Sequence, residues 1–395
     1  RVDTITEKTS GSGTTVSNLK NPNSPFRNLI INGDMQIWQR ATSATTATDG
    51  GYNTVDRWHN VFYSTAGAMT SEREALSVAD QATTGMYYCN LLKCTTADTS
   101  IATDSIVGFR QTIEAQNCQS LNYGTSAAKN VTISFYAKAN ASKTYSLNLW
   151  KRDSTSYYWF KDISVTDSWQ KFTYTISPTA GSTSLITSSG GAIANDNGEG
   201  LELTFILVAG TNYDGTADTW QDSGSDAQHF YDGSIDNFLS STDNTLRITG
   251  VQLEVGETAT DFEHLPFDVQ LQRCQRYFTK FGGDDAFSPF GSGMWKTGTV
   301  ASLILTFPTK MNHEPTMTIA NATATHLRQA GTSPNTSAIA LDVSSTLACM
   351  YNATVSSGGS AGQGTVNFGD STTNCTFSFD SVSYTHLTLP TKRIV

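Results

Sequence analysis

Hydrophobic and polar residues alternate in short segments along most of the chain. Between residues 131 and 138, for example, Val131, Ile133, Phe135 and Ala137 fall on one face of an extended strand. The same pattern predicts further strands at residues 145–150, 157–162, 169–176, 201–208, 248–256, 299–307, 315–319 and 375–380. No sustained helical periodicity is visible between residues 25 and 266. Many short strands of this kind predict an all-β sandwich or barrel.

Interruptions of the pattern divide the chain. A Pro/Asn-rich break at residues 21–25 precedes the main strand-rich region, which we predict to be one domain over residues 27–266. Residues 267–281 are predicted to form a short helical connector. Residues 282–381 are predicted to form a smaller β-rich C-terminal domain.

The two ends of the chain differ from the rest. Residues 1–20 alternate β-branched and polar residues but carry too little apolar surface to fold alone, so a disordered linker is one interpretation. The eleven residues from Val382 to Lys392 resemble one reading frame of a sequencing-library adapter. We therefore interpret residues 382–395 as non-native and expect genuine coding to end near Ser381.

The composition is polar but weakly charged. Only 15% of the 395 residues are charged, against about 25% in an average protein, and the net charge is −10. Such a surface suits β-rich extracellular or virion proteins. Negative charge without a Lys/Arg cluster argues against binding to nucleic acid. No apolar run approaches the ~20 residues of a membrane span, so membrane insertion is not expected.

The cysteines show neither zinc-ligand nor CxxC spacing. We favour reduced, half-buried thiols over disulfides such as Cys89–Cys94, because free cysteine is commonly a small buried hydrophobic residue. The six residues are Cys89, Cys94, Cys118, Cys274, Cys349 and Cys375.

Several short motifs occur in an order that is more specific than any one of them. They are Asn28-Leu-Ile-Ile-Asn-Gly-Asp34, Asp56-Arg-Trp58, Trp169-Gln-Lys-Phe172, residues 248–256, Phe262-Glu-His264 and Cys274-Gln-Arg-Tyr277. Together, over about residues 27–280, they resemble the carbohydrate-binding-module-like jelly roll of bacteriophage tail fibre and tail spike proteins of a marine or metagenomic type. The resemblance implies an antiparallel jelly-roll β-sandwich whose first and last strands are residues 29–32 and 246–255.

The same resemblance implies a function. It describes a virion tail fibre component, made in the bacterial host cytoplasm, that binds a host-surface polysaccharide or other glycan for adsorption. It implies a homotrimer with contacts to other tail proteins. Residues 1–20 would then be the end of a fibre shaft at the threefold axis, and residues 282–381 a tip domain.

One departure from the family concerns calcium. Family members often hold a structural calcium ion between the first and last strands, with a carboxylate two residues after the aspartate of Asn-Gly-Asp and another in the last strand. Here Gln36 and Thr249-Gly250 stand at those places, which leaves Asp34 alone. Because calcium prefers several hard oxygen ligands, we expect no tight calcium site and no other cofactor.

The segments 145–150 and 157–162 flank a polar turn and predict a hairpin. If the turn spans residues 151–156, Trp150 faces Tyr157 and Asn148 faces Trp159 across the strands, while Leu147, Leu149, Tyr158 and Phe160 point inward. The outer face would then present a sugar platform made of Asn148, Trp150, Tyr157, Trp159 and Lys161. The alternative is that a loop or a second subunit covers this face.

The other tryptophans are weaker candidates. For Trp38, Trp58 and Trp169, which lie in strand motifs, we favour core packing. Trp220 lies in a Gly/Asp-rich loop with Asp218, Asp222, Asp226 and His229. That loop could cap a ligand or bind a cation, but we favour a solvated loop.

Two other function classes remain open, a purely structural fibre segment and a tail-spike polysaccharide depolymerase. Glycoside hydrolysis needs two carboxylates set across a cleft. Glu114, Asp153, Glu202 and Asp232 are available, but nothing in their spacing pairs them. No nucleophilic serine or phosphate-binding motif is present, and we expect no catalytic activity.

Overall fold

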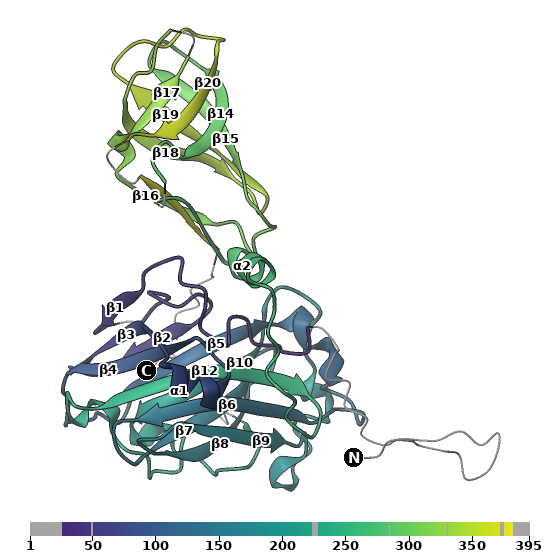
Figure 1. Cartoon of the computed structure of the whole chain (residues 1–395). Coiled ribbons are helices and arrows are strands. Elements are labelled where there is room, and N and C mark those ends of the chain that lie inside the picture. Colours follow the sequence, from purple (N-terminus) through teal and green to yellow (C-terminus); the bar gives the residue numbers. More distant parts are fainter. Residues whose placement is uncertain are drawn as a thin grey trace, which may run out of the picture.

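The computed structural model describes residues 26–48, 50–222, 228–283, 285–329, 331–371 and 375–381. Within these residues the chain forms a larger β-sandwich and a smaller β-rich lobe, which meet beside helix α2 (Phe267–Gln275) (Figure 1). The predictions for residues 1–20 and 382–395 lie outside the described residues.

Two antiparallel sheets of six strands each form the larger lobe. Sheet A has the order β1 (Ser43–Thr46), β3 (Ala68–Ala75), β4 (Tyr88–Thr96), β12 (Thr245–Val255), β6 (Val131–Ala139) and β9 (Gln170–Ile176). Sheet B has the order β11 (Gln221–Asp222), β8 (Tyr157–Val165), β7 (Lys143–Lys151), β10 (Glu199–Ala209), β5 (Ile106–Glu114) and β2 (His59–Tyr63). The predicted fold class, an antiparallel jelly-roll sandwich followed by a smaller β-rich region, is confirmed.

The alternating pattern explains how the two sheets pack. Side chains at every second position of β6 and β10 enter one buried core, which includes Phe135, Leu203 and Phe205. The rings of Phe135 and Phe205 meet edge to face with their centroids 5.0 Å apart. Burial of each such side chain stabilises the fold by about 1.5–3 kcal/mol.

The tryptophans of the strand motifs support the sandwich. Trp58 lies in the core and stacks on Phe109 at 4.7 Å, and Trp38 packs against the same core. Trp169 is partly buried against a smaller apolar cluster. The favoured core-packing interpretation is therefore confirmed for Trp58, and the other two are partly buried.

Trp220 differs from the expectation. The solvated-loop interpretation is wrong, because this side chain is buried in the sandwich core and its indole N–H donates to the Ser177 carbonyl at 2.9 Å. The loop also contains the acidic residues Asp218 and Asp222, and its Asp226 lies outside the described residues.

Residues 29–32 lie beside β12 but do not form the predicted regular strand. The Leu29 N–H donates to the Leu253 carbonyl at 2.8 Å, so the segment belongs to the same sandwich as β12. Asn32 has a left-handed backbone with φ of 59°, which ends any extended geometry there.

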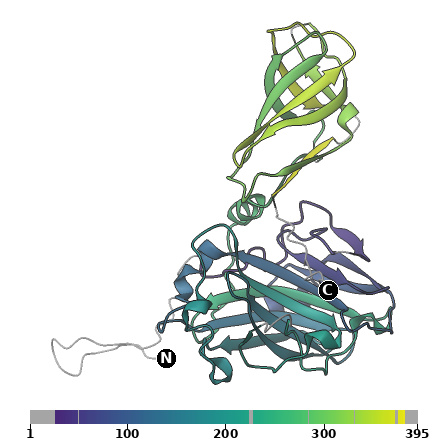
Figure 2. The same ribbon diagram turned by 180° about the vertical axis from the view of Figure 1, so that it is seen from behind.

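The smaller lobe contains two more antiparallel sheets. A three-stranded sheet has the order β13 (Phe278–Gly282), β21 (Thr376–Asp380) and β16 (Thr316–Ala320). A six-stranded sheet, the tip sheet, has the order β17 (Thr325–Arg328), β20 (Gly364–Gly369), β14 (Pro289–Trp295), β15 (Val300–Thr306), β19 (Ala348–Val355) and β18 (Thr336–Ser344). Seen from behind, the strands of the tip sheet curl around one another (Figure 2). The buried side chains of the tip sheet and of the three-stranded sheet form one core.

The predicted connector at residues 267–281 is helical only in its first part. Helix α2 ends at Gln275, and β13 begins at Phe278. The helix stops because Phe278 and the residues after it pair with β21, as in Phe278 opposite Asp380. The domain boundaries themselves stay predictions.

Short helices link the strands. Helix α1 (Val78–Thr84), which the sequence pattern did not reveal, is capped by the Ser77 side chain and ends at Gly85 with φ of 74°. The 3₁₀ helices are η1 (Ala115–Leu121), η2 (Ala180–Ser182), η3 (Ser189–Gly191), η4 (Thr211–Tyr213), η5 (Phe238–Ser240) and η6 (Ala322–Ala324).

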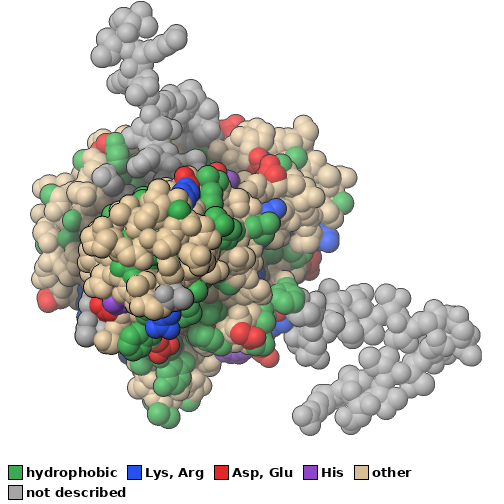
Figure 3. Space-filling view, turned by 90° about the horizontal axis from the view of Figure 1, so that it is seen from above, with side chains coloured by type: hydrophobic (Ala, Val, Ile, Leu, Met, Phe, Trp, Pro, Cys, Tyr) green, Lys and Arg blue, Asp and Glu red, His purple; other side chains and the backbone are tan. Residues whose placement is uncertain are grey.

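All six cysteines are buried and unpaired, as the sequence analysis favours. No helix in the described ranges is long and apolar enough to cross a membrane. From above, the described surface shows few charged side chains, which are scattered among uncharged and hydrophobic ones (Figure 3).

Candidate functional site

The predicted sugar platform depends on the register of the β7–β8 hairpin, and that register differs by one residue. Lys151 pairs with Tyr157, Trp150 with Tyr158, and Leu149 with Trp159. The connecting loop is one residue shorter than we assumed. A shift of one residue turns every side chain of one strand to the other face, so Trp150 and Tyr157 point in opposite directions.

The five platform residues therefore do not share an exposed face. Tyr157 and Trp159 are buried in the core between the sheets. Trp150 is on the outer face of sheet B, but only 6% of it is exposed. Asn148 is buried, with its amide donating to the carbonyls of Trp159 and His229. Lys161 is partly exposed and forms an ion pair with Asp218 at 2.6 Å.

A loop covers the outer face around Trp150, which is one of the two alternatives left open by the sequence. Trp150 packs against Tyr158 with ring centroids 4.9 Å apart and against Phe230 of the loop at 6.3 Å. Tyr213 and Tyr231, also from the segment between β10 and β12, belong to the same apolar cluster. The hydrophobic effect favours covering this aromatic face, and stacking on a sugar here would require the loop to move.

The uncovered part of the outer face of sheet B borders the smaller lobe. It contains a cavity of about 370 Å³, which we call the sheet B cavity. Its size is within the range of about 300–1,000 Å³ that is typical of ligand pockets. It is lined by Tyr52, Arg57, Thr112, Glu114, Arg152, Asp153, Ser154, Asn197, Gly198, Glu199, Tyr277, Asn312 and His313.

The floor beside this cavity is built from paired charges. Glu202 is buried between Arg110 at 3.3 Å and Arg152 at 3.0 Å, and Arg152 also pairs with Glu199 at 2.6 Å. Burial alone would raise the pKa of Glu202, but the two guanidinium groups outweigh burial and lower it. Glu202 is therefore ionised and unsuited to donate a proton.

Tyr277 packs against a second set of charged side chains, which begins with Arg57. The guanidinium of Arg57 lies 3.3 Å from the Tyr277 ring centroid and donates to the Thr112 carbonyl at 2.5 Å. Only 5% of Arg57 is exposed, and its Nε has no hydrogen-bond partner among the described residues. Its backbone has φ of 75°. Such backbone strain in a non-glycine residue is often found at binding sites.

Glu114 joins this group to helix α2. It accepts hydrogen bonds from Arg276 at 2.7 and 3.0 Å and from the Tyr277 hydroxyl. Burial raises the pKa of Glu114, but these bonds outweigh burial and hold the pKa below its usual value. Glu114 is thus a fixed negative charge shared between the sandwich and the junction.

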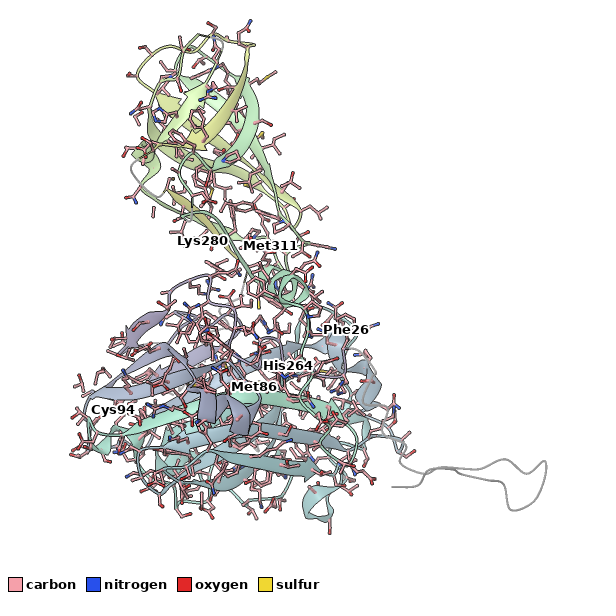
Figure 4. The ribbon with its side chains drawn as sticks, in the orientation of Figure 1. Phe26, Met86, Cys94, His264, Lys280 and Met311 are labelled. Atoms are coloured by element: carbon pink, nitrogen blue, oxygen red, sulfur yellow. The ribbon has the colours of Figure 1, made fainter. Side chains whose placement is uncertain are left out.

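A second cavity of about 390 Å³ shares Glu114 and Tyr277 with the sheet B cavity, and we call it the Arg273 cavity. Its lining combines apolar side chains, amides and two arginines: Phe26, Asn28, Leu29, Ile31, Glu114, Gln116, Asn117, Arg273, Arg276 and Tyr277. Figure 4 labels Phe26 of this cavity near the upper edge of the sandwich. It also labels Met311 at the base of the smaller lobe; the next residue, Asn312, lines the sheet B cavity.

The structure brings some of the candidate carboxylates together. Glu114 and Asp153 both line the sheet B cavity, Glu202 lies beneath it, and Asp232 lies apart near Asp162. In the described part of the chain, no three His, Cys, Asp or Glu side chains converge on a possible metal site. Asp34 instead accepts a hydrogen bond from the Gln270 amide.

The sequence analysis did not single out Arg57, Arg273, Arg276 or Tyr277 as site residues. A signal was nevertheless present. Arg57 belongs to the Asp56-Arg-Trp58 motif, and Arg276 and Tyr277 belong to Cys274-Gln-Arg-Tyr277. The fold places these two motifs in contact, which spacing along the chain did not indicate.

No protein-family description matches the chain, and no curated protein matches it. Similar solved structures do exist. A family 4 carbohydrate-binding module is 15% identical, with a TM-score of 0.26, and the match covers 57% of this chain and 98% of that one. A family 11 carbohydrate-binding module from Clostridium thermocellum is 11% identical, with a TM-score of 0.27 and coverage of 56% and 98%.

The enzymatically active domain of tailspike protein 4 from bacteriophage CBA120 is also similar. It is 11% identical with a TM-score of 0.28, and the match covers 59% of this chain but 22% of the tailspike chain. Identities and TM-scores this low assign neither a ligand nor an activity. The class of the protein, an all-β jelly-roll sandwich with a smaller β-rich lobe, rests on its own sheets.

Proposed function

We propose that this chain is a non-catalytic phage tail fibre component that binds a host-surface glycan in the sheet B cavity. The observation that carries the proposal is the chemistry of the lining. Tyrosine, amide, carboxylate and guanidinium side chains converge on a cavity of about 370 Å³. Convergent polar groups of this kind suit a ligand rich in hydroxyl groups.

The state of the carboxylates supports binding rather than cleavage. A glycosidase needs a carboxylic acid that holds its proton near neutral pH. Glu114 and Glu202 have the opposite property, because arginines lower the pKa of both groups. The residues around the cavity therefore favour hydrogen bonding to hydroxyl groups.

Assignment to a virion is supported by the motifs that resemble phage tail proteins. Assembly in a bacterial cytoplasm agrees with six buried, unpaired thiols, because disulfides are rare in reducing compartments. Other tail proteins and the host glycan are the proposed partners.

A homotrimer is part of the same proposal. Ile304, Met350 and Val343 are successive cross-strand neighbours on the outer face of the tip sheet. Ile304 is 56% and Val343 57% exposed. Exposed aliphatic side chains in a row support contact with another copy of the chain.

The test is a glycan array followed by affinity measurements on cavity variants. Asn197→Ala and His313→Ala should each weaken binding about three- to tenfold, the usual effect of one lost hydrogen bond. Asn195→Ala is the matched control, since Asn195 is exposed in the same loop and does not line the cavity.

Three results would contradict the proposal. Full affinity in both cavity variants would place the glycan elsewhere. No binding to any host glycan would favour a purely structural segment. Release of reducing ends from host polysaccharide would favour the depolymerase.

A further inference from the structure

The Arg273 cavity contains a guanidinium group that no carboxylate of the described residues contacts closely. Arg273 forms no ion pair with any residue of the described chain. Its hydrogen bond to the Asn28 carbonyl is 3.5 Å long, which is weak. Buried or half-buried charges are usually paired, so this group is available to a ligand.

The nearby acidic groups are already engaged. Glu114 is held by Arg276, and Glu263 accepts hydrogen bonds from the main-chain N–H groups of Arg27 and Asn28. Burial lowers the pKa of Arg273 and Arg57 adds to this effect, whereas Glu263 and Tyr277 partly offset it; the guanidinium stays charged in a protein. An anion that entered the cavity would therefore interact favourably with the guanidinium of Arg273.

The two cavities differ in the balance of their charges. The Arg273 cavity has two arginines and one carboxylate, Glu114. The sheet B cavity has two arginines, Arg57 and Arg152, but three carboxylates. An anionic group is thus favoured in the Arg273 cavity and a neutral ring in the sheet B cavity.

We propose that the Arg273 cavity binds an anionic group carried by the glycan, so that the ligand is an acidic sugar. The planar fork of Arg273 suits the two oxygens of a carboxylate or a phosphate. The amides of Gln116 and Asn117 line the same cavity, and Phe26, which is 59% exposed, offers an apolar wall for the sugar ring. The inference rests on the proposed function and specifies the class of its ligand.

The experiment titrates the full chain with sodium glucuronate, glucose 6-phosphate and glucose, followed by NMR or calorimetry. At least one of the two acids should bind about ten- to a hundredfold more tightly than glucose, as expected for charge-assisted hydrogen bonds. The stronger of the two identifies a carboxylate or a phosphate as the natural group. Added salt should weaken binding of the acid but not of glucose.

Variants of Arg273 separate charge from shape. Arg273→Gln should reduce the affinity for the acid to that for glucose, whereas Arg273→Lys should retain part of it. Arg73→Gln is the matched control, because Arg73 lies on β3 of sheet A, forms no described ion pair and lines neither cavity.

Equal affinity of wild type and Arg273→Gln for the acids would overturn the inference. Equal affinity of wild type for glucose and the acids would also overturn it. If neutral host glycans bind in the array and acids show no preference, the proposed function stands and this inference fails. If no glycan binds, both fail.

Discussion

Asp162 is a carboxyl group whose surroundings oppose ionisation. It lies on the outer face of β8, opposite Ser146 of β7. Burial and the nearby carboxylate of Asp232 raise the pKa of Asp162 from 3.8 to about 7, although the hydroxyls of Ser146 and Ser234 partly offset this. The folded state therefore binds this proton more tightly than the unfolded state does.

This difference predicts a pH-dependent effect of Asp162→Asn. In the wild type, the stabilising contribution of the bound proton is lost as pH rises from about 4 to about 7. An asparagine cannot ionise, so the variant should gain about 2 kcal/mol relative to the wild type between pH 4.5 and pH 8, after allowance for solvent screening. Urea unfolding at the two pH values measures it, and a difference that does not change with pH would contradict the assignment.

Single residues were the least predictable part of the site. Sequence alone showed that Arg57 and Tyr277 belong to motifs, but not that the guanidinium lies 3.3 Å from the ring. Trp220 was misjudged for a related reason. A Gly/Asp-rich neighbourhood predicts a solvated loop, whereas a large indole gains more by burial in the core.

The secondary-structure elements were easier to predict than their alignment. Strands β6, β7, β8, β9, β10 and β12 are at the positions that alternation indicated. The pairing of β7 with β8 was wrong by one residue, because alternation fixes which residues share a face within one strand but not which residue of the next strand lies opposite. Because of this one-residue difference, Tyr157 and Trp159 point into the core instead of toward the outer face of sheet B.

Asn28 explains why the segment at residues 29–32 belongs to the sandwich without being a regular strand. Its side-chain amide donates to the Val251 carbonyl at 3.1 Å, and its side-chain oxygen accepts from the N–H groups of Leu253 and Ile30 at 3.0 Å. A side chain thus replaces part of the main-chain ladder with β12.

Asn28→Ala should therefore destabilise the sandwich. Loss of the amide leaves buried main-chain groups of β12 without partners, and we expect the free energy of unfolding to fall by about 2–4 kcal/mol. Chemical denaturation measures this change. Asn195→Ala, at an exposed position, should stay within about 0.5 kcal/mol of the wild type, and an equally small effect of Asn28→Ala would show that β12 holds the segment by its main chain alone.

At the scale of the whole molecule, two separate apolar cores are connected by polar contacts and by a small apolar cluster of Ile31, Ile37, Cys274 and Tyr277. The core of the sandwich and the core of the smaller lobe share no residue. Between them, Arg40 pairs with Asp380 at 2.8 Å and lies 3.7 Å from the Phe278 ring centroid. The Gln39 amide also donates to the Phe278 carbonyl at 2.9 Å. These contacts lie near the ends of β13 and β21. The sequence predicted a connector at residues 267–281, but it did not indicate that Gln39 and Arg40 contact it.

The junction predicts how the molecule unfolds. If these contacts couple the two lobes, scanning calorimetry of the wild type should show one transition. Arg40→Gln removes the ion pair with Asp380 and the contact with Phe278, and should weaken the coupling by up to about 3 kcal/mol. The smaller lobe, which buries the smaller core, should then unfold first in a separate transition.

Arg328→Gln is the control, because Arg328 lies over Phe368 within the smaller lobe, away from the junction. One unchanged transition in Arg40→Gln would show that the lobes are coupled through α2 and Glu114 instead, and the same experiment on Arg276→Gln would then be expected to separate them.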